Sequence, residues 1–208
     1  MKNDPYEKVA ARYDRLAGSP PVKLRKGGVG VYPPRENLKI LDVGCGTGEM
    51  LVTYAKPGCE LVGIDVSPSM LDVARQKLGA SARLLLEDAT HMSFADGTFD
   101  LVTSMLALHE MSAENRSPVL RECRRVAKPG GHILLIDFHY GPFPFPTGWL
   151  YRMLIGLAER NAGKEHFAHY REFLAHRGLD GLVEESGITV ERRFVFDAGI
   201  AAIYLLKA

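Results

Sequence analysis

Short apolar runs alternate with helical patterns along the middle of the chain. The runs lie at 39–43, 61–66, 82–87, 99–105 and 132–138. Each run has the length of a β-strand, and most of its residues are apolar, which is typical of strands that are buried on both faces. We therefore predict an α/β fold with a doubly wound, mostly parallel sheet that has helices on both faces.

Serine caps and proline or glycine breakers mark the helices between these runs. The pattern predicts a helix at 48–56, and the Ser-Pro pair at 67–68 is expected to begin the next helix. A second Ser-Pro pair at 117–118 repeats this signal and is expected to begin a third helix. The glycine turn at 128–131 should end that helix before the last parallel strand.

The N-terminal part of the chain does not follow this alternation. Residues 5–16 fit a short helix that carries Tyr6 and Tyr13 on one face. Residues 18–37 are rich in proline and glycine, so we expect a connector or a loosely folded cover there and not a regular element. Within a single domain of residues 1–208, residues 1–37 are therefore predicted to form a cover helix and loop.

The alternation also ends after the fifth apolar run. A loop rich in proline and phenylalanine leads into an amphipathic helix within 141–163, and we expect residues 141–180 to form a helical cap insertion. The last two apolar segments, at 188–196 and 200–208, flank a turn signal at Asp197-Ala198-Gly199. They are predicted to pair as an antiparallel hairpin at the end of the sheet.

Composition and charge exclude several classes of protein. The 208 residues are 46% hydrophobic, and a net charge of +1 argues against a broad nucleic-acid surface. Cys45, Cys59 and Cys123 show no metal-binding or redox spacing, so we expect reduced thiols. The N-terminus lacks the apolar core of a signal peptide, and no apolar run reaches the roughly 18–20 residues that span a bilayer. We therefore expect a soluble, cytoplasmic protein without a transmembrane segment.

A glycine-rich bend follows the first apolar run in the stretch LDVGCGTGEM, at 41–50. Gly44, Gly46 and Gly48 stand between a predicted strand and a predicted helix, where backbone N–H groups and the helix dipole favour a bound anion or cofactor. The spacing is GxGxG, and Glu49 occupies the place of the last glycine of a dinucleotide-binding motif. A dinucleotide is therefore disfavoured, and the absence of a Gly-Lys-Ser/Thr motif disfavours a nucleoside triphosphate.

Three acidic residues lie at the ends of three successive predicted strands. Asp42, Asp65 and Asp88 should meet at the carboxyl edge of the sheet, which is where open α/β sheets bind ligands. A carboxylate at Asp65 can accept both hydroxyl groups of a ribose. Asp88, beside Ala89, can accept a hydrogen bond from an adenine amino group, although an isolated aspartate at this place is more often a turn cap.

These segments together resemble the class I S-adenosylmethionine-dependent methyltransferases. The resemblance is carried by LDVGCGTG, LVGIDVSPSMLDVARQKL, EDATHMSFADGTFDLVTSMLALHEM and LRECRRVAKPGGHILLIDF, in this order within about residues 38–140. It implies a seven-stranded Rossmann-like sheet and a small-molecule acceptor, as in the related quinone-biosynthesis and phospholipid-methylating enzymes. YEKVAARYD near the start resembles their N-terminal cover helix.

The resemblance also implies which residues bind the cofactor S-adenosyl-L-methionine and its product S-adenosyl-L-homocysteine. The three glycines make room for the methionine part, Asp42 supports its amino group, and Asp65 holds the ribose. Met70 suits adenine packing and the core equally well. The complete implied set is Tyr13, Asp42, Gly44, Cys45, Gly46, Gly48, Asp65, Val66, Met70, Asp88, Ala89 and Met105. Cys45 is interpreted as a small loop filler and not as a nucleophile.

The implied reaction is in-line displacement at an activated methyl group, so the protein must mainly align the reactants and exclude water. His109, after the fourth predicted strand, is the candidate catalytic residue, either as a proton acceptor or as a group that positions the acceptor. The alternative is that His109 and Glu110 only shape the loop.

A second group of polar residues lies further along the chain. The stretch KEHFAHYREF can present His166, His169 and Tyr170 on one helical face, and His139 precedes Tyr140. No paired carboxylate ligand is evident from the sequence, so we expect no metal site and interpret these residues as a solvated face or a pocket wall.

Aromatic and aliphatic residues are concentrated in the predicted cap. Such side chains suit an apolar or amphipathic acceptor, and peripheral contact with a membrane would follow from such an acceptor. They equally suit packing of the cap onto the sheet. The residues concerned are Phe143, Phe145, Trp149, Leu150, Met153 and Leu154.

Two other functions remain open at this point. A nicotinamide-dependent oxidoreductase would use a similar fold, although Glu49 and the GxGxG spacing disfavour it. A methyltransferase-like protein could instead bind the cofactor and only regulate a partner. The identity of the acceptor, its accepting atom (C, N or O) and the oligomeric state do not follow from the sequence.

Overall fold

The computed structural model describes residues 4, 6–17, 19–196 and 199–208. Its strands are β1 (Lys39–Val43), β2 (Glu60–Asp65), β3 (Ala82–Leu86), β4 (Phe99–Met105), β5 (Ala127–Phe138), β6 (Thr189–Phe196) and β7 (Ala201–Lys207). They form one seven-stranded sheet in the order β3-β2-β1-β4-β5-β7-β6. Strands β1 to β5 pair in parallel, and β7 pairs antiparallel with both β5 and β6. The predicted α/β class and the antiparallel end of the sheet are therefore confirmed, whereas residues 197–198 of the predicted turn lie outside the described residues.

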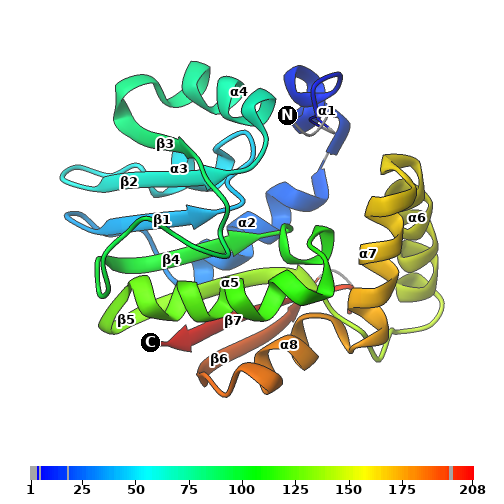
Figure 1. Ribbon diagram of the computed structural model, residues 1–208. Helices are drawn as coiled ribbons and strands as arrows, with labels where there is room; N and C mark the ends of the chain where they lie inside the picture. Colours follow the sequence, from blue (N-terminus) through cyan, green and yellow to red (C-terminus); the bar gives the residue numbers. More distant parts are fainter. Residues whose placement is uncertain (1–3, 5, 18, 197–198) are drawn as a thin grey trace.

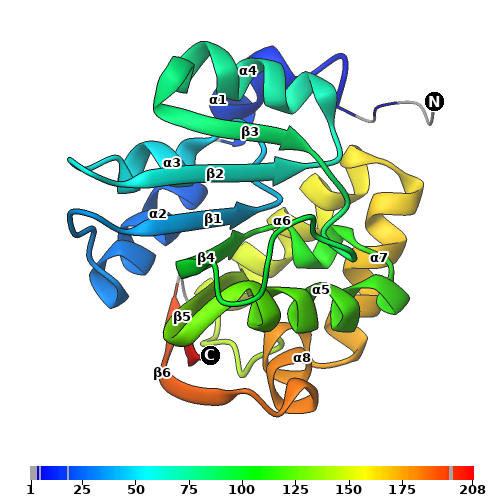
Figure 2. The ribbon, with the colours of Figure 1, turned by 60° about the vertical axis from the view of Figure 1, so that its left-hand side comes forward.

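Helices cover both faces of this sheet (Figures 1 and 2). Helices α2, α3 and α4 lie on one face, α5 and α8 lie on the other, and α6 and α7 stand beyond the carboxyl ends of the parallel strands. None of the helices in the described ranges is long and apolar enough to cross a membrane. The helical elements are η1 (Ala10–Arg12), α1 (Tyr13–Ala17), α2 (Ser19–Val31), α3 (Glu49–Tyr54), α4 (Pro68–Leu78), η2 (Gly79–Ser81), η3 (Leu108–Glu110), α5 (Ala113–Val126), α6 (Thr147–Ala162), α7 (Lys164–Ala175) and α8 (Gly178–Ser186).

The central strands are apolar throughout because each contributes to two cores. In β5, Ile133 and Leu135 pack into the core beneath α5 and α8, whereas Leu134 and Ile136 pack into the core beneath α2 and α3. All four side chains are fully buried. This two-sided burial explains why the sequence shows continuous apolar runs instead of alternation.

Helix α4 begins and ends where the sequence predicts. The Ser67 hydroxyl accepts a hydrogen bond from the Met70 N–H at 3.1 Å, and Pro68 occupies the first helical position, where no N–H donor is needed. Gly79 ends the helix with a φ of 52°, a conformation that side chains other than that of glycine rarely adopt. The start of α4 is therefore fixed directly after β2.

The expectation of an irregular segment at 18–37 is wrong over most of its length, because α2 is a regular helix. Its prolines fall in the first turn, where helices tolerate them. Its glycines allow close approach to the sheet: a Cβ at Gly27 would lie 2.8 Å from the Ile203 Cδ1 atom, and one at Gly28 would lie 2.6 Å from Ile136 Cδ1. Packing against the sheet therefore overrides the low helix propensity of glycine.

Two other helix boundaries differ from the sequence prediction. Helix α5 begins at Ala113 after Ser112, so Pro118 lies inside it and removes one internal hydrogen bond without ending the helix. At the N-terminus, the predicted single helix is a turn followed by η1 and α1. Helix α5 ends at Val126, just before the glycine turn expected at 128–131. Strand β5 begins at Ala127 and includes this turn, so it starts earlier than the predicted 132, and its register with β4 shifts there.

Candidate functional site

The glycine bend connects β1 to α3, and its three glycines serve two different purposes. Gly44, Gly46 and Gly48 have φ angles of 68°, 50° and 80°, in the region that favours glycine. A Cβ at Gly44 would lie 2.6 Å from the Ala107 Cβ, and one at Gly48 would lie 2.7 Å from Leu78 Cδ1. A Cβ at Gly46 would meet no atom within 4 Å. Gly44 and Gly48 thus permit packing, whereas the backbone at Gly46 faces open space that a ligand can enter.

Asp65, at the end of β2, is tied to this bend by its carboxylate. Oδ2 accepts a hydrogen bond from the Gly46 N–H at 2.8 Å, and Oδ1 accepts one from the Ser67 N–H at 2.8 Å. Burial raises the pKa of Asp65, and these N–H donors oppose that rise. The carboxylate is therefore oriented beside the open backbone, with oxygen lone pairs left to accept further hydroxyl groups.

The side chains of Asp42, before the bend, and Cys45, within it, are buried. The Asp42 Oδ1 accepts a hydrogen bond from the Thr103 hydroxyl at 2.7 Å, and burial raises the pKa of Asp42 to about 7. Burial also raises the pKa of the Cys45 thiol well above its usual value, which disfavours a reactive thiolate. This geometry supports the interpretation of Cys45 as a loop filler.

Asp88 follows β3 two residues beyond Leu86, which is paired with Asp65 in the sheet. Its side chain is exposed, and Oδ1 accepts hydrogen bonds from the Thr90 N–H and the Thr90 hydroxyl at 2.9 and 2.8 Å. Ala89 is buried beside it. Asp88 therefore caps a turn, which is the alternative that the sequence favoured for an isolated aspartate, and its contact with adenine stays a prediction.

Three further residues of the implied cofactor set differ in their exposure. Val66, just beyond β2, is 71% exposed, whereas Met70 on α4 is 3% exposed. Met105 is partly buried at the end of β4. The burial of Met70 supports its role in the core, while the positions of Val66 and Met105 leave them accessible at the carboxyl edge.

The N-terminal segment lies across this edge of the sheet. Asp4 accepts hydrogen bonds from the Ser67 hydroxyl and the Ser69 N–H, and Asp14 accepts one from the Thr47 hydroxyl at 2.6 Å. The ring of Tyr13 packs edge-on against that of Tyr6, with centroids 5.9 Å apart. These contacts join the segment to the glycine bend and to the start of α4, although the two lie far apart in the sequence.

A second group of polar side chains lies beyond the ends of β4 and β5. His109 on η3 is 3% exposed, and its Nδ1 atom lies 2.8 Å from Oδ1 of the fully buried Asp137. Its Nε2 atom lies 3.7 Å from Glu159 on α6 and 4.0 Å from Glu110. His166 on α7 contacts the same Glu159 carboxylate. We refer to His109, Glu110, Glu159 and His166 as the polar cluster.

The charge of His109 is set by its surroundings. Burial opposes the charged imidazole, but the carboxylates of Asp137, Glu110 and Glu159 outweigh it and raise the pKa of His109 to about 9. Burial likewise raises the pKa of Glu110, whose carboxylate accepts a hydrogen bond from the Tyr6 hydroxyl. The polar cluster is therefore a strongly coupled group at the same edge of the sheet as the glycine bend.

Helix α7 places its polar residues on the face that packs against η3. The Nδ1 atom of His169 lies 2.7 Å from the Glu110 carbonyl oxygen, and the ring of Tyr170 lies edge-on to that of His109, with centroids 6.2 Å apart. The sequence prediction that His166, His169 and Tyr170 share one face agrees with these contacts. His139 lies apart from them and contacts Asp180 on α8.

Sequence reasoning missed three residues that organise this region. Asp137 is the next-to-last residue of β5, as Asp42 is of β1, and Asp65 is the last residue of β2. The same pattern of acids near strand ends could therefore have identified Asp137. Glu159 lies seven positions before His166, across a helix boundary that the sequence did not reveal. Arg116 is 4% exposed, and no pattern in the sequence distinguishes it from the other arginines of its helix.

Of the two interpretations left open for the apolar residues of the cap, packing onto the sheet does not describe most of them. Phe143 is partly buried against the core, but five side chains of the cap are at least half exposed. Their exposed fractions are 85% for Phe145, 64% for Trp149, 53% for Leu150, 57% for Met153 and 50% for Leu154. Helix α6 therefore presents an apolar surface to solvent.

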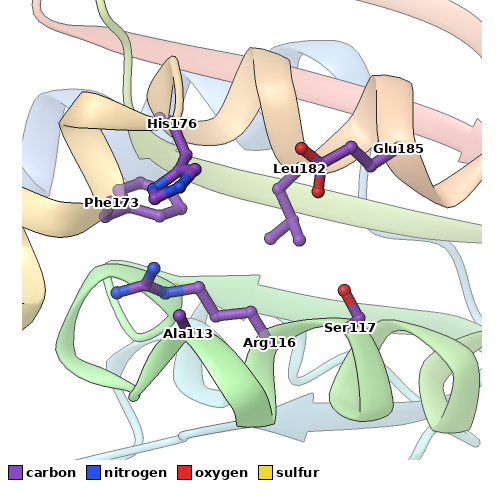
Figure 3. A pocket seen from close by; sticks show the side chains of 8 residues that line it. Ala113, Arg116, Ser117, Phe173, His176, Leu182 and Glu185 are labelled. Carbon is purple, nitrogen blue, oxygen red and sulfur yellow. The ribbon is translucent and has the colours of Figure 1, made fainter.

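A hollow of about 220 Å³ lies between α5, α7 and α8, on one side of the sheet (Figure 3). The Arg116 guanidinium points from α5 toward Phe173 and His176 in this view. Arg116 donates hydrogen bonds to the carbonyl oxygens of Leu108, Met111 and His169, at 3.1, 2.7 and 2.9 Å. None of the residues predicted to bind the cofactor lines this hollow, so it is distinct from the carboxyl edge.

Comparison with known proteins agrees with this arrangement. Residues 41–135 match the methyltransferase domain family. An uncharacterized methyltransferase of Synechocystis is 31% identical over 84% of this chain and 81% of its own length. The demethylmenaquinone methyltransferase of Thermus thermophilus is 29% identical over 96% and 98%, and a ubiquinone/menaquinone biosynthesis C-methyltransferase of Cupriavidus necator is 31% identical over 82% and 75%.

Solved structures share the fold. A putative methyltransferase of Haloferax volcanii, solved with the Trm112 methyltransferase activator, has a TM-score of 0.71 at 19% identity and covers 100% of this chain and 99% of its own. A SAM-dependent methyltransferase of Aquifex aeolicus has a TM-score of 0.61 at 22% identity, with 99% of both chains covered. The sheet order, the glycine bend and the sequence relatives lead to one conclusion: this chain belongs to the class I S-adenosylmethionine-dependent methyltransferases.

Proposed function

We propose that this enzyme methylates an amphipathic acceptor, a polar ring that carries a long apolar tail and resides in a membrane. The observation that carries the proposal is the apolar stripe of α6, formed by Trp149, Leu150, Met153, Leu154 and Leu157. Each of these side chains is at least half exposed. A surface helix of a soluble protein normally turns such a stripe toward its own core.

The two faces of α6 have opposite roles. The stripe residues follow the spacing i, i+1, i+4, i+5 and i+8, which places them on one side of the helix. Glu159, on the inward side, contacts His166 and lies 3.7 Å from His109. Helix α6 is therefore apolar on its outer side and carries the Glu159 carboxylate on its inner side. Such a helix suits an acceptor whose tail stays in the lipid while its head reaches the polar cluster.

The proposed cofactor residues lie at the same edge of the sheet. S-adenosylmethionine supplies an activated methyl group. The open backbone at Gly46 and the oriented carboxylate of Asp65 suit its methionine and ribose parts. Asp42, whose pKa burial raises to about 7, would be ionised by a nearby ammonium group and could then attract it. Tyr13 and Met105 are proposed to close the site. These roles agree with the residues present, since Gly46 leaves room and Asp65 keeps free lone pairs.

His109 is proposed to contact the head of the acceptor, by accepting its proton or by positioning it. A pKa of about 9 keeps the ring mostly protonated at neutral pH, which favours the positioning role. The Asp137 carboxylate fixes one ring nitrogen, so the other nitrogen is directed to Glu159 and the space beside it. A His109→Ala enzyme that keeps full turnover with normal cofactor affinity would contradict this role. Residues 141–180 are proposed to act as the cap that carries Glu159 and His166 to this place.

The quinone substrates named for two relatives guide the choice of probe. We propose a panel of three acceptors: a demethylmenaquinol with its isoprenoid tail in vesicles, a water-soluble analogue without the tail, and small polar amines. Release of S-adenosylhomocysteine measures turnover for each. Turnover on the tailed acceptor supports the proposal, whereas turnover on the amines alone contradicts it. No turnover on any member favours the alternative of a cofactor-binding regulator.

The role of the apolar stripe is tested by replacing part of it. The double substitution Trp149→Ser with Leu154→Ser removes two exposed apolar side chains, each worth roughly 1.5–3 kcal/mol when buried. We expect KM for the tailed acceptor in vesicles to rise at least about tenfold. Val190→Ser, on the exposed face of β6, is the matched control and should change nothing. Equal KM values for the double variant and the wild type would contradict the role of the stripe.

A further inference from the structure

Three ligand atoms of the polar cluster come together from three separate elements. His109 on η3, Glu159 on α6 and His166 on α7 each offer one nitrogen or oxygen atom, and these atoms lie within 4.8 Å of one another. The His109 Nε2 atom is 3.7 Å from the Glu159 Oε2 atom, and His166 Nε2 contacts that same oxygen. We propose that these three residues bind one divalent first-row transition-metal ion.

The surroundings of His109 are those of a metal ligand. Asp137 can only accept a hydrogen bond, so the Nδ1 atom of His109 carries the proton that it donates at 2.8 Å. Nε2 is then the ring atom that faces Glu159, and an ion that binds at Nε2 would take the place of the proton that the charged ring carries there. A carboxylate that holds the far nitrogen of a ligating histidine is the usual second layer of a metal site, where it fixes the ring and makes the ligand more basic.

Asp137 is itself held rigidly. Its Oδ2 atom accepts hydrogen bonds from the N–H groups of Leu108 and His109, and Oδ1 accepts one from the N–H of Phe138. The Asp137 side chain is fully buried. The position of the His109 ring is therefore fixed by the backbone of two elements, η3 and β5, before any ion binds.

The distances and charges suit a cation. An ion with bonds of about 2.0–2.2 Å keeps neighbouring ligand atoms about 3.0–3.5 Å apart, so small side-chain rotations would close the triad. The side chains of Glu159 and His166 are only 14% and 18% exposed. Glu110 adds a further carboxylate 4.0 Å from His109. A dication would offset the repulsion among the sheltered carboxylates of Glu110, Asp137 and Glu159.

The ligand types restrict the identity of the ion. Two imidazoles and one carboxylate suit Zn²⁺, Fe²⁺, Co²⁺ or Mn²⁺, whereas Ca²⁺ and Mg²⁺ prefer oxygen ligands alone. Three protein ligands leave at least one coordination position open. If the proposed function is correct, this open position would take an oxygen atom of the acceptor head, at the same edge of the sheet as the cofactor.

Metal binding is tested on the full chain, freed of metal by a chelator, without cofactor or acceptor. The outcome is therefore independent of whether the proposed acceptor is correct. Calorimetric titration with Zn²⁺ should show one saturable site per chain. Nitrogen NMR of histidine-labelled wild-type protein should show shifts of the Nε2 resonances of two histidines, His109 and His166, on addition of Zn²⁺. This second measurement needs no variant.

Four substitutions locate the site. His166→Ala and Glu159→Gln should each lower the affinity for Zn²⁺ at least about tenfold. His176→Ala and Glu165→Gln replace exposed residues of the same region and should leave the affinity unchanged. S-adenosylhomocysteine binding checks that each variant is folded. No saturable binding by the wild type, equal affinity in all five proteins, or no shift of the two histidine resonances would overturn the proposal.

Discussion

The Nδ1 atom of His109 and the Oδ1 atom of Asp137 lie 2.8 Å apart, in a place from which water is almost completely excluded. The pair joins the loop after β4 to the end of β5, because Asp137 also accepts hydrogen bonds from the N–H groups of Leu108 and His109. The hydrogen bonds of Asp137 therefore hold the polar cluster rigidly at the carboxyl edge of the sheet. The stability of the protein and its binding of ligands should depend on these hydrogen bonds and on the glycine bend.

Replacing Asp137 should destabilise the fold strongly. In Asp137→Ala, buried N–H groups of Leu108, His109 and Phe138 lose their acceptor. We expect the free energy of unfolding to fall by about 3 kcal/mol or more, and Asp137→Asn, which keeps one acceptor oxygen, to lose less. Urea denaturation of the three proteins measures this. An Asp137→Ala protein within about 0.5 kcal/mol of the wild type would mean that these hydrogen bonds contribute little.

Two glycines of the same bend should respond differently to alanine. Gly46→Ala places its Cβ in open space, so the cost should be about 1–2 kcal/mol for the left-handed backbone alone. Gly48→Ala would also bring its Cβ to 2.7 Å from Leu78 and 3.2 Å from Ala74, adding about 1–3 kcal/mol. Thermal unfolding should therefore rank Gly48→Ala as the less stable protein.

Cofactor binding by the Gly46→Ala variant tests whether the ligand approaches the bend at this glycine. Gly46→Ala should lower the affinity for S-adenosylhomocysteine at least about tenfold, since its methyl group occupies the space that the ligand enters. If Gly46→Ala binds as tightly as the wild type, the open side of the bend does not face the cofactor.

Asp42 should make stability depend on pH. Its pKa in the folded protein is about 7, whereas an unfolded aspartate has a pKa of about 3.9. Between about pH 4 and about pH 7, Asp42 therefore stays protonated in the folded protein but is ionised in the unfolded chain. The free energy of unfolding should fall as pH rises from about 4 to about 7, by as much as about 4 kcal/mol. Asp42→Asn lacks this group, and the difference in unfolding free energy between the two proteins should grow across that window. A constant difference would show that Asp42 titrates normally.

Arg116 should also stabilise the loop after β4 that carries His109. Its guanidinium donates to the carbonyl oxygens of Leu108, Met111 and His169, so it joins α5 to η3 and α7. Arg116→Ala should lower the free energy of unfolding by about 3 kcal/mol, and Arg116→Lys should recover only part, because an ammonium lacks the planar fork. Amide hydrogen exchange should show faster opening of η3 and α7. Unchanged exchange in η3 and α7 would mean that Arg116 does not stabilise these two elements.

Much of the fold could be predicted from local signals. The five parallel strands follow from apolar runs, and α4 follows from a serine cap, a first-turn proline and a terminal glycine. The same logic failed at α2, whose glycines are needed for packing against Ile203 and Ile136. It also failed at α5, where Pro118 lies inside a longer helix. In both places contacts distant in sequence outweigh the local preference.

The candidate site was likewise predictable only in part. The acids at the ends of β1, β2 and β3 were predictable, because parallel strands end at one edge. The meeting of His109, Glu159 and His166 was not, because it depends on how α6 and α7 pack beside η3. The direction of the apolar stripe on α6 could not be predicted either, since periodicity shows that a stripe exists but not whether it faces the core or the solvent.

The central claim is that the bend at Gly46 and the carboxylate of Asp65 hold the cofactor, and calorimetry with S-adenosylhomocysteine tests it most directly. The wild type should bind one molecule per chain, Asp65→Ala should bind at least about tenfold more weakly, and Asp72→Ala, an exposed aspartate on α4, should bind like the wild type. Circular dichroism checks that each variant is folded. A wild type without affinity, or a folded Asp65→Ala protein that binds as tightly as the wild type, would contradict the account.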